Sequence, residues 1–206
     1  MRTALSAVVV GTTLALLVAG CAGGRNPSPS GSTTASGAAT ETVPAVTPSP
    51  APSEDQVPVP KNASTDRSVQ SPAAGSQLVL TAVRTASHTG VDRVVFEFAG
   101  SGAPGWTVEY VDRAIAQGSG QSITVAGSSV LRVSMTGTAY PTEASPSPSP
   151  VARRIPGDGA GIVTEVVQDG TFEGDTVSFI GLSGERRPFA VQTIQSPTRV
   201  IVDIVR

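Results

Sequence analysis

A charged pattern occurs twice in the sequence, at residues 93–98 (Arg-Val-Val-Phe-Glu-Phe) and 199–204 (Arg-Val-Ile-Val-Asp-Ile). Side chains of a β-strand point alternately to two faces, so each copy separates its apolar residues from an arginine and an acid. These two charges lie about 13 Å apart within one copy, whereas neighbouring strands would pair the copies crosswise. A guanidinium is a forked, permanently charged donor that suits a carboxylate ligand. The candidate ligand-binding residues of the repeat are Arg93, Glu97, Arg199 and Asp203.

Two interpretations of this repeat remain open. In the first, the charged side chains are solvated edges of ordinary strands and their role is architectural. In the second, the domain is a pseudo-symmetric sandwich in which each of two sheets carries one copy. Each sheet would then present a polar outer face to a ligand. Short strand patterns recur by chance, so the sequence does not decide between the two.

Aromatic side chains offer a second candidate surface. Trp106, Val108 and Tyr110 share one face of a predicted strand, a spacing that would form a platform on which sugar rings stack. We therefore include Trp106 and Tyr110 among the candidate ligand-binding residues. Packing in the core is the favoured alternative, because a domain with few aromatic residues needs most of them inside.

Residues suited to catalysis are sparse. His88 is the sole histidine, and no carboxylates stand near it at metal-ligand spacing, so we expect no metal, no cofactor and no catalytic residue. A Ser-His-Asp arrangement that uses His88 and Asp92 stays open, because such residues assemble in space rather than in sequence. The favoured role of His88 is to order the turn before the strand that begins at Arg93. Two arginine pairs in predicted loops, 153–154 and 186–187, either contact carboxylates or phosphates or are simply solvated.

Cys21 is the only cysteine, and it closes an uncharged stretch that begins after Arg2. The residues Val18-Ala19-Gly20-Cys21 resemble the lipobox of bacterial lipoproteins, in which the cysteine thiol is lipidated and becomes the new N-terminus. We predict a signal peptide at residues 1–20 and lipidation of Cys21, with acyl chains such as palmitate holding the protein on the extracytoplasmic face of the cell membrane. The alternatives are a transmembrane anchor, which the polar residues of the stretch disfavour, and an ordinary secretory signal.

Residues 21–76 are rich in Pro, Ser, Thr, Ala and Gly and contain no aromatic residue. Such a segment buries too little apolar surface to offset the conformational entropy lost on ordering, about 1–2 kcal/mol per residue. We predict a lipid-anchored, disordered linker that carries length and no fold.

Residues 77–206 are the predicted folded domain. Apolar residues there alternate with period two between Gly, Pro and Ser turns, which predicts an all-β, antiparallel β-sandwich. Residues 141–161 form a predicted mobile loop rich in Pro, Ser and Gly. Without residues 1–20 the chain keeps 13 of its 14 basic residues and all 16 acidic ones, so its formal charge of −3 indicates no nucleic-acid partner. The predicted strands are 77–85, 93–99, 107–112, 122–125, 130–136, 163–168, 176–180, 189–194 and 199–205.

The domain carries a family resemblance. The strand at 199–204 resembles the Arg-Val-Val-hydrophobic-Asp-Leu strand of the AMIN domain, found in envelope proteins that include N-acetylmuramoyl-L-alanine amidases and secretin pilotins. Most of residues 77–206 is similar to the AMIN-like domain of lipoproteins from high-GC Gram-positive bacteria. The segments that carry this second similarity are 88–98, 104–106, 110–112, 181–182, 188–189 and 197–199.

The resemblance implies a β-sandwich that binds or targets cell-wall material, with peptidoglycan or an envelope protein as the partner. The sequence departs from the family pattern in two respects, the insertion at residues 141–161 and the lack of an amidase domain after the sandwich. We therefore expect a membrane-anchored envelope lipoprotein that binds without doing chemistry. A small hydrolase of wall substrates and a scaffold for protein–protein contacts are the alternatives.

Overall fold

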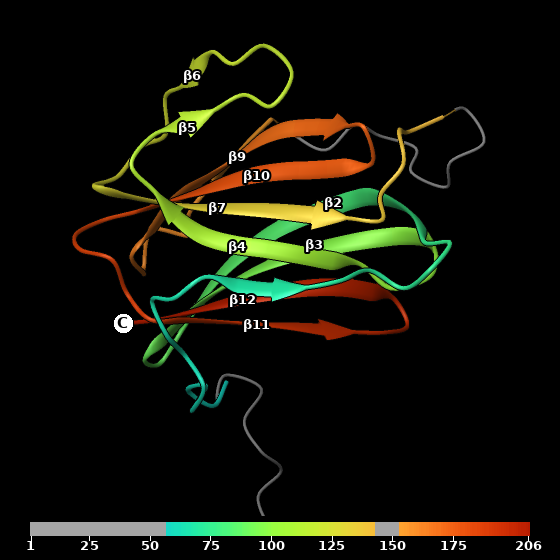
Figure 1. Ribbon diagram of the computed structural model, residues 1–206. Coiled ribbons are helices and arrows are strands. Elements are labelled where there is room, and N and C mark those ends of the chain that lie inside the picture. The colour runs from blue at the N-terminus through green and yellow to red at the C-terminus, as the bar shows by residue number, and fades with distance from the viewer. Residues whose placement is uncertain (1–56, 143–152) are drawn as a thin grey trace, which may run out of the picture. The chain divides into compact units, whose positions relative to one another are not determined.

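The computed structural model describes residues 57–142 and 153–206, where the chain folds into strands and turns without a helix. Two antiparallel sheets lie face to face as a sandwich (Figure 1). The predicted all-β sandwich is therefore confirmed. The predicted signal peptide, Cys21 and residues 21–56 of the linker lie outside the described residues. No helix in the described part of the chain is long and apolar enough to cross a membrane.

The larger sheet has six strands in the order β1-β4-β7-β10-β9-β8. Its strands are held by antiparallel ladders, of which β7 with β10 and β9 with β10 are the longest. These strands are β1 (Ser68–Gln70), β4 (Gly105–Val111), β7 (Ser129–Thr136), β8 (Arg154–Pro156), β9 (Val163–Phe172) and β10 (Asp175–Leu182).

The smaller sheet has four strands in the order β11-β12-β3-β2. They are β2 (Gln77–His88), β3 (Val91–Ser101), β11 (Phe189–Ile194) and β12 (Thr198–Val205). A separate two-stranded ribbon, β5 (Ala114–Ile115) with β6 (Ser122–Ile123), projects from the end of β4 (Figure 1). All nine predicted strands are present, and β1, β5 and β8 are additional.

The core lies between the two sheets and follows from the period-two pattern. Phe96 on β3 and Val202 on β12 point inward from the small sheet, and Val108 on β4 and Leu131 on β7 meet them from the large sheet, all fully buried. Each such side chain contributes about 1.5–3 kcal/mol by leaving water. The alternate residues of β3 and β12 necessarily lie on the outer face of the small sheet.

The structure contradicts one of the two open interpretations of the repeat and the predicted extents of the linker and the mobile loop. The two copies of the charged pattern do not lie on different sheets, because β3 and β12 are neighbours in the small sheet. The unfolded linker does not extend to residue 76, because β1 pairs with β4 and Ser64 forms a bridge with Phe189. An edge strand is held largely by backbone hydrogen bonds, so it needs little apolar sequence to form.

The predicted mobile loop 141–161 also contains a strand. β8 pairs with the outer edge of β9, and Arg154 forms an ion pair of 2.8 Å with Glu165 on β9. Its proline, Pro156, stands at the end of an edge strand, where the missing N–H removes no interior ladder bond. Residues 143–152 of the predicted loop lie outside the described part of the chain.

Candidate functional site

The antiparallel register of β3 and β12 places the two copies of the charged pattern head to tail. Arg93 lies opposite Asp203, Glu97 lies opposite Arg199, and an apolar pair separates them. Crosswise pairing of the copies, which the sequence allowed for neighbouring strands, is the arrangement found. It forms an ionic row on the outer face of the small sheet, which we call the ionic face and define as Arg84, Arg93, Glu97, Arg199 and Asp203.

At one end of the ionic face, Arg93 and Asp203 form a forked pair. Arg93 donates from Nε to Oδ1 at 2.7 Å and from Nη2 to Oδ2 at 2.8 Å. The Asp203 side chain is 3% exposed and that of Arg93 is 22% exposed, so the carboxylate is almost out of water. Such a pair depends on both partners, because removal of one leaves a buried charge without compensation.

At the other end, Glu97 accepts hydrogen bonds from two arginines at one oxygen, Oε2. Arg199 donates from Nε at 2.8 Å and Arg84 from Nη2 at 2.7 Å. Hydrogen bonding from Arg199, and secondarily from Arg84, holds the pKa of Glu97 below its usual value of 4.5. This cluster is more exposed than the Arg93 pair, with over half of the Arg84 side chain in water.

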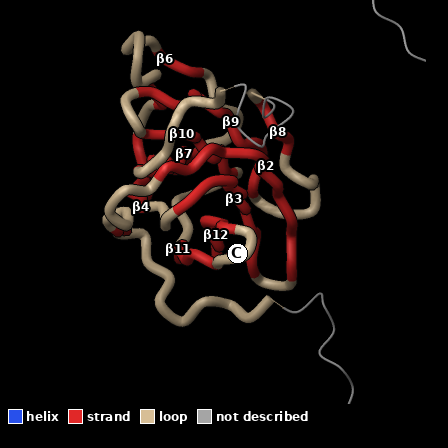
Figure 2. The backbone as a smooth tube through the Cα atoms, turned by 90° about the vertical axis from the view of Figure 1, so that its right-hand side faces the viewer, coloured by secondary structure: helices blue, strands red, loops and turns tan. Residues whose placement is uncertain are grey.

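A groove of about 370 Å³ adjoins the buried end of the ionic face. Arg93 and Asp203 line it together with Gln192 of β11, and residues 58–62, which precede β1, form its opposite wall. Figure 2 shows the loop before β1 running past β11 and β12 on this side of the molecule. Lys61 on that wall is exposed and makes no hydrogen bond or ion pair with any described residue.

The two aromatic candidates do not form a platform. Trp106 is 6% exposed within the core, and its indole Nε1 donates to Ser68 Oγ of β1 at 3.2 Å, so packing in the core is the arrangement found. Tyr110 is half-buried, its ring packs edge-on against Phe189 with centroids 5.9 Å apart, and the Arg186 guanidinium lies 5.5 Å from its ring centroid. Burial raises the pKa of Tyr110 above its usual value of 10.0.

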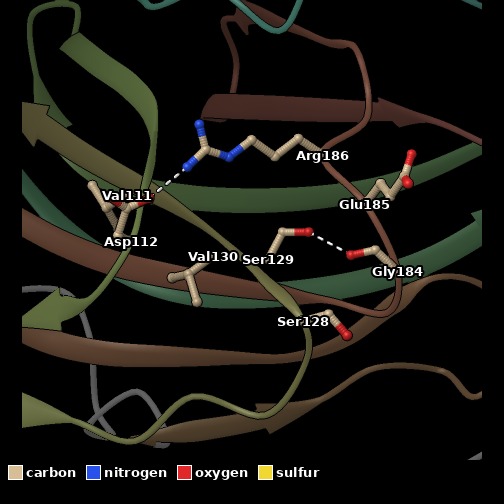
Figure 3. Close-up of a pocket in the computed structure, with 8 residues that line it drawn as sticks. All are labelled: Val111, Asp112, Ser128, Ser129, Val130, Gly184, Glu185 and Arg186. Carbon is tan, nitrogen blue, oxygen red and sulfur yellow. Dashed lines mark hydrogen bonds and ion pairs between the residues drawn. The ribbon is translucent and has the colours of Figure 1, made fainter.

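The Tyr110 phenol holds the loop that connects β10 to β11. Its hydroxyl donates to the backbone oxygen of Arg187 at 2.6 Å and accepts from the backbone nitrogen of the same residue at 2.8 Å. The loop thereby closes one side of a pocket of about 630 Å³ at the end of β4 (Figure 3). Asp112, Glu185 and Arg186 are its charged residues, and we call it the loop pocket. The sequence analysis noted the adjacent arginines 186 and 187, but no sequence pattern indicated that Arg186 would contact Asp112.

His88 and Asp92 do not form a catalytic pair. His88 ends β2 at the turn before β3, and its backbone oxygen accepts a hydrogen bond from Arg206. The buried Asp92 carboxylate accepts from the backbone nitrogen of Val163 at 2.9 Å and lies 3.3 Å from Arg206 Nε. Among residues 57–142 and 153–206, no group of three or more His, Cys, Asp and Glu side chains could hold a metal ion.

A β-sandwich with a charged outer face and a charged pocket at one end has the features of a binding module. The AMIN-like domain family matches residues 78–206, so this chain belongs to that family and the resemblance seen in the sequence is confirmed. AMIN-like domains are generally binding domains without catalysis of their own, and membership suggests a location in the cell envelope. No curated protein and no solved structure matches the chain.

Proposed function

We propose that this protein is a non-catalytic, lipid-anchored envelope protein whose domain binds carboxylates of peptidoglycan in the groove beside Arg93. The observation that carries the proposal is an imbalance between donors and acceptors in that groove. Lys61 and Arg93 supply cationic donors and Asn62 supplies an amide, whereas the one carboxylate of the groove, Asp203, is buried and already accepts from Arg93 and, at 3.4 Å, from Gln192 Nε2. A groove of this kind attracts an anion.

Arg93 is suited to act in such a groove although it is paired. Asp203 uses only Nε and Nη2 of its guanidinium, and Nη1 makes no hydrogen bond with any described residue. The pairing fixes the orientation of the guanidinium, so little side-chain entropy is lost when a ligand accepts from Nη1. Glu97 and Arg199 continue the same face and would contact a polymer that extends beyond the groove.

In this proposal, a lipid anchor holds the domain at the cell envelope. Acyl chains on Cys21 would hold the protein at the membrane, each buried CH₂ contributing about 0.8 kcal/mol. Residues 21–56 would then separate the domain from the bilayer, and an extended chain of that composition spans about 3.1 Å per residue. Cys21→Ser should shift the protein from the detergent phase to the aqueous phase or block its processing. Unchanged detergent partitioning would contradict lipidation.

Cosedimentation of residues 22–206 with purified peptidoglycan tests the ligand. Lys61→Ala should weaken retention about tenfold, because a charge-assisted hydrogen bond contributes about 1.5–3 kcal/mol. The matched control is Arg113→Ala, which removes an exposed cation that does not line the groove. Both variants should keep the thermal midpoint of the parent chain.

Three outcomes would contradict the proposal. Equal retention of the two variants would move the ligand away from the groove. Failure of the parent chain to sediment would remove peptidoglycan as the ligand. Release of soluble wall fragments during incubation would favour the hydrolase alternative.

A further inference from the structure

The loop pocket lies apart from the groove and is absent from the proposal above. Its wall combines one guanidinium, from Arg186, with two carboxylates, from Asp112 and Glu185. Figure 3 shows Arg186 extending across the opening toward Asp112, while the carboxylate of its neighbour Glu185 points away from Asp112. Charges of both signs therefore line one cavity of about 630 Å³.

The Arg186–Asp112 ion pair does not close this pocket. The two side chains meet at 2.7 Å, but that of Asp112 is 96% exposed and that of Arg186 is 52% exposed. Ion pairs in water contribute about 0–1 kcal/mol, so a ligand can replace either partner at small cost. Glu185 is exposed and makes no hydrogen bond or ion pair with any described residue.

The loop itself is held in place before any ligand arrives. Ser129 Oγ donates to the backbone oxygen of Gly184 at 2.6 Å, which fixes the loop at its start. Tyr110 fixes it at Arg187 by two hydrogen bonds, and the Tyr110 ring lies beneath the Arg186 guanidinium. A preorganised cation and a fixed loop reduce the entropy lost on binding.

From this arrangement we infer that the loop pocket binds a zwitterionic amino-acid group, with the ligand carboxylate on Arg186 and the ligand ammonium on Asp112. A plain anion would meet two carboxylates, and a plain cation would meet the arginine. A group that carries both charges meets Arg186 with its carboxylate and Asp112 with its ammonium, so neither side chain faces a like charge. The inference rests on the proposed function only for the source of the ligand, the peptide part of the wall polymer.

The test uses three compounds with related skeletons and residues 22–206 of the protein. The probe is 2,6-diaminopimelic acid, which carries an amino-acid group at each end. Pimelic acid lacks its amines, and 1,5-diaminopentane lacks its carboxylates. Titration followed by amide chemical shifts should show saturable shifts at residues 184–187 with the probe alone. Equal binding of either control compound would overturn the inference.

Two variants locate the site. Arg186→Gln and Asp112→Asn should each weaken binding of the probe about tenfold or more, because each removes one charge-assisted contact. Arg187→Gln is the matched control, since its side chain does not line the pocket. All three positions are exposed, so the variants should fold normally. Unchanged affinity in both pocket variants would also overturn the inference.

The outcomes separate this inference from the proposed function. If the protein sediments with peptidoglycan but shows no saturable binding of diaminopimelic acid, peptidoglycan binding in the groove is supported and amino-acid binding in the loop pocket is contradicted. If diaminopimelic acid binds at residues 184–187 but the protein does not sediment with peptidoglycan, amino-acid binding in the loop pocket is supported and peptidoglycan binding in the groove is contradicted.

Discussion

The two ends of the ionic face are built from the same residue types in the same antiparallel register, yet their environments differ. Asp203 is buried and receives both guanidinium contacts from Arg93, whereas Glu97 lies nearer to water and is shared by Arg84 and Arg199. The difference arises from the neighbours of each end. Residues 58–62 line the groove together with Arg93 and Asp203, whereas Glu97 and Arg199 do not line it. The same combination of guanidinium and carboxylate is therefore buried at one end and partly solvated at the other.

The largest expected effect comes from breaking the buried end. Arg93→Ala should lower the free energy of unfolding by about 3 kcal/mol, because it leaves the Asp203 carboxylate buried without its partner. Urea denaturation measures the difference. A loss below about 1 kcal/mol would mean that the two ends are energetically alike.

A double variant checks the cause of that loss. Arg93→Met with Asp203→Leu replaces the pair by apolar side chains, and such replacements of buried ion pairs are often neutral or stabilising. The double variant should therefore be more stable than Arg93→Ala alone. If it is equally unstable, the loss arises from packing of the arginine stem and not from the uncompensated charge.

A smaller effect should follow from uncovering the groove. A chain that begins at Ala63 lacks residues 58–62 and lets water reach Asp203 from the groove side. We expect the cost of Arg93→Ala to fall by about 1 kcal/mol in this shortened chain, within the 0.5–3 kcal/mol range of coupling between contacting sites. A double-mutant cycle by urea denaturation measures it. Full additivity would show that residues 58–62 do not control the burial of the pair.

The exposed end should respond weakly. Arg199→Ala should cost about 1 kcal/mol or less, because the pair is partly solvated and Arg84 stays on Glu97. The same denaturation assay applies. A cost as large as that of Arg93→Ala would erase the contrast between the two ends.

The smallest effect is a pH dependence that belongs to the exposed end. The pKa of Glu97 is lower in the folded chain than its usual 4.5, so its contribution to stability is complete above that value. It is lost as the pH falls through the folded pKa. Below a pH of about 5, the stability of the parent chain should fall more steeply than that of Glu97→Gln. If the free energies of unfolding of the parent chain and of Glu97→Gln, measured by urea denaturation, fall in parallel from pH 6 to pH 3, Glu97 makes no such contribution.

Alternation in the sequence was sufficient for most of the fold. Residues 93–98 and 199–204 separate apolar from charged side chains strictly, and that separation predicted strands and an inward face and allowed crosswise pairing of the charges. Strand β1 was beyond prediction, because Ser68–Gln70 owes its place to the open edge of β4 and not to its own apolar content. The same holds for β8, which depends on the edge of β9 and on Glu165.

The candidate sites were predicted less well than the fold. The arginines and acids of the ionic face were named from their types, but the sequence contained no sign that residues 58–62 would cover one end. The loop pocket brings Asp112 beside Arg186, two residues that are 74 positions apart along the chain. A contact over that separation depends on how two sheets stack, and no local pattern encodes it.

The sequence by itself determined the period-two strands, the polarity of their faces and the complementary charges of the repeat, because these follow from the short-range geometry of an extended backbone. The tertiary structure alone decided that both copies share one sheet, that one ion pair is buried and the other wet, and which loops line the pockets. Burial and long-range contact depend on what the rest of the chain places around a residue, and that is fixed only when the sheets pack.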